Sequence, residues 1–209
     1  MSPRKYNLEN RRAESEQTRA RIVGAAQELL AGEDATPVFS IDELARHAGV
    51  ARMTVYYQFG SKRGLLEAIF DSLAAGGLAE ALPKAYGQNE PVRALTGLIR
   101  AFTRFWASER LAIRRLRALA VLDPEVEASL RERDERRREG LRVVLKRLAA
   151  DSRIAAQNDL DEAVDILHML TSFEVFDSLA AGRRSLEGVV GVVKRLAVHA
   201  LDLAESEKA

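Results

Sequence analysis

A short run of basic, hydroxyl-bearing, amide and aromatic side chains lies in the first third of the chain. Its members are Arg52, Met53, Thr54, Tyr56, Tyr57, Gln58 and Lys62. Arginine and threonine reach base edges, tyrosine hydroxyls and lysine reach phosphates, and apolar groups meet thymine methyls. A helix of about two turns with adjacent tyrosines is a poor core element but fits the major groove. The run therefore predicts a surface that contacts double-stranded DNA.

Two short helices must position that run, and residues 39–59 have the pattern of a helix-turn-helix. Ser40 is expected to cap the first helix and is also counted among the DNA-contacting residues. Glu43 can return a bond to the Ser40 backbone as a capping box, while Phe39 can pack on the helix as a hydrophobic staple. Gly49 tolerates the positive φ that a sharp turn between helices requires. The second helix then presents its polar side chains outward.

The run GVARMTVYYQFGSKRGLL resembles the DNA-binding segment of the TetR family of bacterial transcriptional regulators. The likeness rests on Gly-Val, a threonine, two aromatics, Phe-x-x-Lys and a leucine pair, and it extends back through an earlier helix to cover roughly the first third of the chain. Two positions depart from the family pattern. Ala51 stands where a serine or threonine commonly caps the recognition helix, a loss typically of about 1 kcal/mol. Gly64 stands in the first turn of the next helix, where a better helix former is usual.

The composition is that of an ordinary globular protein: 47% of the 209 residues are hydrophobic and 30% are charged. No stretch approaches the length of apolar sequence that spans a bilayer, and the N-terminus lacks the apolar core of a signal peptide. The chain has no cysteine, which excludes disulfides, thiolate catalysis and cysteine-based metal sites. We therefore expect a cytoplasmic protein that has no contact with a membrane.

The net charge is only +1, so bulk charge does not indicate a nucleic-acid partner. The N-terminal segment is locally basic, however, with Arg4, Lys5, Arg11 and Arg12 against the single acid Glu9. Residues 1–16 lack apolar periodicity and are expected to be mobile. A solvated basic tail is one interpretation of this segment, but beside the helix-turn-helix pattern the basic residues favour an arm that contacts DNA phosphates.

Apolar spacing at three and four residues predicts an all-α fold of about nine helices, with no alternating strand pattern. The expected ranges are 17–31, 40–48, 52–58, 61–75, 90–107, 109–122, 124–150, 160–181 and 185–204. Residues 1–63 would form an N-terminal arm and a three-helix DNA-binding domain, and residues 64–209 a helical domain for effector binding and dimerisation. The pair Gly76–Gly77 is either a simple helix end or a bend between the two domains.

The last two helices, within residues 160–204, are apolar over more of their circumference than one core face requires. This excess predicts a homodimer in which these helices from two subunits form a four-helix bundle. The family resemblance implies the same dimer, bound to an inverted-repeat operator. A dimer also suits one short helix-turn-helix, which seldom binds tightly enough without a symmetric partner.

Aromatic side chains in the second domain are either a filled core or the wall of a ligand pocket. The resemblance implies a pocket for a small apolar or amphipathic effector, and the candidate residues are Phe102, Phe105, Trp106, His168, Met169 and Phe173. Repression that ends when this ligand binds likewise follows from the resemblance, not from the residues.

Enzymatic function is not expected. The three histidines, His47, His168 and His199, lack metal-ligand spacing, and the sequence has neither a glycine-rich phosphate loop nor a nucleophile elbow. No metal, cofactor or catalytic residue is therefore predicted. The remaining alternative is a constitutive, architectural DNA-binding protein without an effector pocket.

Overall fold

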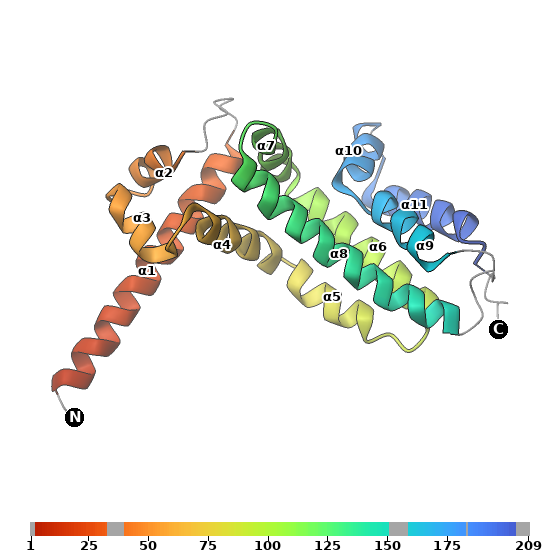
Figure 1. The fold of residues 1–209 in the computed structure, drawn as a ribbon, viewed down its shortest axis with the longest axis horizontal. Helices are drawn as coiled ribbons and strands as arrows, with labels where there is room; N and C mark the ends of the chain where they lie inside the picture. The colour runs from red at the N-terminus through yellow and green to blue at the C-terminus, as the bar shows by residue number, and fades with distance from the viewer. Residues whose placement is uncertain (1–2, 33–39, 151–158, 183, 204–209) are drawn as a thin grey trace. The chain divides into compact units, whose positions relative to one another are not determined.

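The computed structural model describes residues 3–32, 40–150, 159–182 and 184–203, and over these residues it is helical with no strand (Figure 1). The all-α prediction is confirmed. The helices are α1 (Pro3–Ala31), α2 (Ile41–His47), α3 (Arg52–Phe59), α4 (Lys62–Ala75), α5 (Leu78–Tyr86), α6 (Pro91–Ser108), α7 (Arg110–Ala120), α8 (Pro124–Ala150), α9 (Leu160–Leu170), α10 (Phe173–Ala181) and α11 (Leu186–Ala200). Within the described residues, no helix is both long and apolar enough to cross a bilayer.

Two differences from the sequence prediction raise the number of helices from about nine to eleven within the described residues. A short helix, α5, follows Gly77, whose φ of 137° ends the preceding helix and begins the next. The range 160–181 contains two helices, because the chain breaks at Thr171 and Ser172. The Ser172 side chain accepts from the Val175 N–H at 3.3 Å and so caps α10. A serine cap thus interrupts a stretch whose apolar spacing looks continuous.

The expectation of a mobile segment over residues 1–16 is wrong for most of its length, because α1 already begins at Pro3 and its first turns extend past α2 and α3 (Figure 1). Hydrogen bonds to α3 hold the middle of α1. The Ser15 hydroxyl donates to the Gln58 side chain at 3.2 Å, and Arg19 donates to the Gln58 carbonyl at 2.6 Å. Polar contacts of this kind leave no apolar periodicity, so the sequence pattern does not indicate a helix over these residues.

Contacts divide the chain into two compact units, the first made of Met1–Leu73 with Arg114–Leu130 and the second of Ala74–Ile113 with Arg131–Ala209. In the first unit, Arg115 ties the later segment to the C-terminus of α1. Its guanidinium donates to the Leu29 carbonyl at 2.8 Å and to the Gly32 carbonyl. These carbonyls lie at the C-terminal end of α1, where backbone acceptors lack partners within the helix. Nothing in the sequence pattern predicts this contact between distant segments.

The second unit has a core built on α6, which buries most of one face among its neighbours. Glu90 caps that helix, since its carboxylate accepts from the Val92 N–H at 3.1 Å and the Arg93 N–H at 2.7 Å. The fully buried core side chains of the unit include Leu98, Ile99, Leu141, Leu145, Leu148, Val164 and Leu167. Burial of this kind contributes about 1.5–3 kcal/mol per large apolar side chain.

Candidate nucleic-acid interface

The helix-turn-helix forms as predicted from local signals. Ser40 adopts an extended backbone, and its side chain accepts from the Glu43 N–H at 3.1 Å. The Glu43 carboxylate accepts a bond from Arg46, its neighbour on the same helix. Gly49 has a φ of 63° at the turn between the helices. The predicted packing of Phe39 lies outside the described residues.

The outer face of α3 is exposed, while its inner face is anchored in the core of the first unit. Val55 and Phe59 are buried, whereas 73% of Met53 and 85% of Tyr57 is exposed. An exposed methionine and tyrosine side by side have no packing role within the described residues. They are suited to a partner with flat bases, methyl groups and phosphate oxygens.

Arg52 belongs to the same face and is held in position by its neighbours. Its guanidinium donates to both carboxylate oxygens of Asp42, at 2.9 and 3.1 Å, and lies 5.8 Å from the centre of the Tyr56 ring. More than half of the side chain is exposed. A guanidinium fixed in this way can still present further N–H groups to a base or phosphate. Thr54 and Tyr56 are half-buried on the same helix.

Gln58 and Lys62, also predicted to contact DNA, make contacts with segments outside α2 and α3. The Gln58 side chain accepts from Ser15, as described above, so it faces α1. The Lys62 ammonium forms an ion pair with Asp123, and only 23% of the lysine side chain is exposed. The structure therefore brings Arg52, Met53, Tyr56 and Tyr57 to one surface, with Gln58 and Lys62 engaged beside it.

The missing cap of α3 gives a first testable prediction. Ala51 has the extended backbone of a cap residue, with φ −70° and ψ 146°, but no side-chain bond to the helix. Ala51→Ser supplies a hydroxyl that can accept from the Thr54 N–H, so the free energy of unfolding should rise by about 1 kcal/mol. Urea unfolding followed by circular dichroism measures the change. Equal midpoints for the variant and the wild type would contradict the prediction.

Four of the six candidate ligand-binding residues come together in the second unit. The ring centres of Phe102, Phe173 and Phe105 lie 6.3, 5.7 and 4.9 Å from that of Trp106. The indole N–H donates to the Thr171 carbonyl at 3.0 Å. Met169 is on the neighbouring α9 but 56% of it is exposed. The aromatic side chains therefore pack on one another, as in a core.

Arg137 joins this aromatic cluster, although the charged stretch 131–139 predicts a solvated face. Only 6% of the residue is exposed. Its guanidinium donates to the Thr171 hydroxyl at 2.8 Å, the His168 carbonyl at 2.6 Å and the Asp134 carboxylate at 3.1 Å. It also lies 6.0 Å from the centre of the Phe102 ring. The solvated reading is wrong at this position.

A signal for the burial of Arg137 was present in the sequence. The residue lies seven positions from both Leu130 and Val144, so the three share one face of a helix. Both apolar neighbours are buried. Because arginine is charged, the apolar pattern alone does not predict that this position is buried. A long side chain whose two terminal nitrogens both donate to acceptors can occupy such a position.

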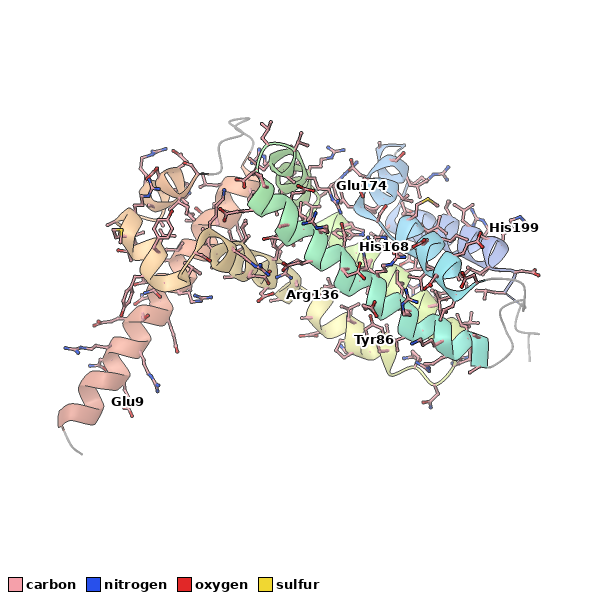
Figure 2. All side chains as sticks on the ribbon, in the orientation of Figure 1. Glu9, Tyr86, Arg136, His168, Glu174 and His199 are labelled. Carbon is pink, nitrogen blue, oxygen red and sulfur yellow. The ribbon has the colours of Figure 1, made fainter. Side chains whose placement is uncertain are left out.

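His168 contacts Arg137 at the edge of the same cluster. Burial lowers its pKa below the usual value, and the positive charge of Arg137 lowers it further. Figure 2 labels His168 on α9. Its Nε2 atom lies 2.9 Å from the guanidinium of Arg137 on α8. The same Nε2 also lies 3.2 Å from the Asp134 carbonyl oxygen, so this atom faces both a donor and an acceptor. Within the described part of the chain, no group of histidine and acidic side chains has the arrangement of a metal site.

A family model described as "Bacterial regulatory proteins, tetR family" matches residues 22–69, which contain the helix-turn-helix. Two curated proteins of Pseudomonas putida are each 40% identical to this chain over 60 residues, or 29% of its length. They are the HTH-type transcriptional regulator SrpR and the uncharacterised HTH-type transcriptional regulator TtgW. The match covers 28% of SrpR and 44% of TtgW, so the chain spans less than half of each relative.

Solved structures match nearly the whole chain. A protein from Rhodococcus sp. that is ascribed to the TetR family has a TM-score of 0.69 at 18% identity, covering 89% of this chain and 98% of its own. A TetR transcription regulator from Haloarcula marismortui has a TM-score of 0.66 at 17% identity, covering 90% and 97%. At these identities the likeness establishes the fold, including the helical second part.

Proposed function

We propose that the chain belongs to the TetR family of bacterial regulatory proteins and binds operator DNA as a sequence-specific transcriptional regulator. The family is one of regulators rather than enzymes. The observation that carries the proposal is the exposed face of α3, where Met53 and Tyr57 are turned outward while Val55 and Phe59 fix the helix from behind. This face lies inside the segment that matches the family model.

The regulator is proposed to be a cytoplasmic homodimer that uses residues 160–204. Two-fold symmetry would place two α3 helices about one helical turn apart on an inverted repeat. Apolar side chains that remain exposed on these helices support the proposal, because Met169 on α9 is 56% and Leu196 on α11 is 47% exposed. A partner subunit would cover both.

The regulator is further proposed to be a repressor that a small apolar or amphipathic ligand releases from DNA. The aromatic cluster around Trp106 supports this proposal, since Phe102, Phe105 and Phe173 form a largely apolar region with His168 and Arg137 at its edge. Such a mixture of apolar surface with few polar groups is typical of ligand sites. The ligand can lower DNA affinity only as far as it prefers the conformation that binds DNA poorly.

The test uses fluorescence anisotropy with a duplex selected from a random pool by repeated binding to the protein, and a scrambled duplex as comparison. We expect saturable binding of a dimer with a specificity ratio of about 10³ or more. Equal, salt-sensitive binding to both duplexes would favour the architectural alternative. An effector is then sought by release of the selected duplex, with the emission of Trp106, the single tryptophan, as a second signal.

Tyr57→Ala is expected to weaken binding to the selected duplex by about 10- to 100-fold, the usual effect of losing one good contact to DNA. The stability of the protein should not change, because 85% of the side chain is exposed. Val143→Ala is the matched control, since this residue is also apolar and exposed but lies on α8. If Tyr57→Ala and Val143→Ala bind the duplex equally well, α3 does not read the groove through this face.

A further inference from the structure

Lys62 and Asp123 form an ion pair between two segments of the first unit that lie far apart in the sequence. Lys62 is in the first turn of α4, just past the end of α3, and Asp123 precedes α8. Both side chains are about three-quarters buried, with 23% and 25% exposed. Pairs this sheltered are screened by salt much less than pairs on the open surface.

The Asp123 carboxylate divides its two oxygens between two tasks. Oδ1 accepts from the backbone N–H groups of Glu125 at 3.1 Å and Val126 at 3.4 Å, and so caps α8. Oδ2 holds the Lys62 ammonium. The capping bonds fix the carboxylate in place, so Lys62 meets a rigid acceptor.

Asp123 carries its negative charge at neutral pH. Burial raises the pKa of this carboxyl, but the bonds from Lys62 and from the Val126 and Glu125 backbone outweigh burial and bring the pKa below its usual value. The ammonium therefore faces a full negative charge. Any other anion that takes Lys62 must compete with it.

We propose that Asp123 competes with DNA for Lys62, holding the ammonium in the free protein and releasing it to a backbone phosphate when α3 enters the groove. This inference rests on the proposed function. Asp123 thereby sets DNA affinity below the value that the positive charges of the interface would otherwise reach. By its position near α3, Lys62 has the features of a simple phosphate contact. Under this proposal, a carboxylate of the same chain limits how much Lys62 contributes to DNA affinity.

The pair makes a distinct prediction for the salt dependence of binding. Each phosphate that a cation neutralises releases counterions and contributes about 0.9 to the slope of log K against log salt. In the wild type, Lys62 releases a counterion from DNA, but Asp123 loses its own cationic partner and attracts a counterion in turn. The two effects offset each other, so Lys62 adds little to the slope. Removing the charge of Asp123 should therefore expose the full contribution of Lys62.

The central variant is Asp123→Asn, because asparagine caps a helix as well as aspartate but carries no charge. We expect affinity for a scrambled duplex at low salt to rise about three- to tenfold and the slope to steepen by about 1. Asp123→Ser, a second neutral capping residue, should behave alike if asparagine disturbs the fold. Thermal unfolding of both variants checks that α8 keeps its cap.

Two further variants separate the pair from general charge. Glu125→Gln removes the same charge from the first turn of α8, but its side chain does not hold Lys62. It should change affinity less than twofold, an effect of the size expected for a screened surface charge. In the double variant, Lys62→Gln should abolish the gain in affinity that Asp123→Asn produces. In the wild-type background, Lys62→Gln should cost less affinity than it does in the Asp123→Asn background.

The outcomes are separable from those for the proposed function. A wild-type protein that binds neither duplex at low salt overturns both proposals. If the wild type binds DNA, but Asp123→Asn is unchanged, weaker, or matched by Glu125→Gln, only the competition between Asp123 and phosphate is overturned. A gain in affinity that survives Lys62→Gln in the double variant overturns it as well, because the gain would then not pass through Lys62.

Discussion

Arg137→Met is expected to lower the free energy of unfolding by about 2–4 kcal/mol, as is typical of breaking a buried ionic network from one side. Methionine fills much of the same volume but donates no hydrogen bond. The Asp134 carboxylate and the His168 carbonyl would each lose a donor. Asp134 remains a quarter exposed and can recruit water, which keeps the loss below that of a fully buried partner.

Urea unfolding measured by both circular dichroism and Trp106 fluorescence checks this prediction. The indole donates to Thr171, whose hydroxyl accepts from Arg137, so the emission reports on the same cluster. Lys146→Met is the control, because it makes the same type of change at an exposed position of α8. A loss for Arg137→Met no larger than that for Lys146→Met would show that the buried guanidinium adds nothing to stability.

Gly64→Ala is expected to cost about 1–3 kcal/mol of stability, the usual range for overpacking, and to weaken DNA binding as well. A β-carbon at this position would overlap the backbone carbonyl oxygen of Phe59, the last residue of α3. Backbone cannot move aside as a flexible side chain can. The corner between α3 and α4 would therefore have to open. The helix propensity gained by alanine is too small to offset this overlap.

Gly24→Ala in α1 provides the opposite result as a control. Nothing lies within 4 Å of the position that its β-carbon would occupy, so the variant should gain up to about 1 kcal/mol from helix propensity. Thermal unfolding and duplex binding are measured for both variants. Stabilisation by Gly64→Ala would mean that the tight contact with Phe59 is absent in solution.

Features specified by neighbouring residues were predictable from the sequence. The cap at Ser40, the turn at Gly49 and the buried positions Val55 and Phe59 depend on residues within a few positions of one another. The aromatic cluster was partly predictable for the same reason, because helical spacing places Phe102, Phe105 and Trp106 close together. Local signals of this kind are the most reliable part of a sequence.

Features that depend on contacts between distant segments were not predictable. Lys62 looks like a free phosphate ligand until the fold brings Asp123 against it, and Gln58 looks exposed until α1 covers it. Gly64 looks like a weak helix residue, yet the close carbonyl of Phe59 leaves no room for another side chain. In each case the deciding atom belongs to another element or to the preceding corner, which a pattern of apolar and polar residues does not encode.

The contribution of Arg114–Leu130 to the first compact unit limits how this chain can be recombined with related proteins. A chimera that takes only residues 1–63 from this chain and everything else from another regulator would leave behind Arg115 and Asp123. The carbonyls that end α1 and the ammonium of Lys62 would then meet whatever the other parent supplies. Exchange of the proposed DNA-binding part therefore requires two separate stretches of sequence to be transferred together.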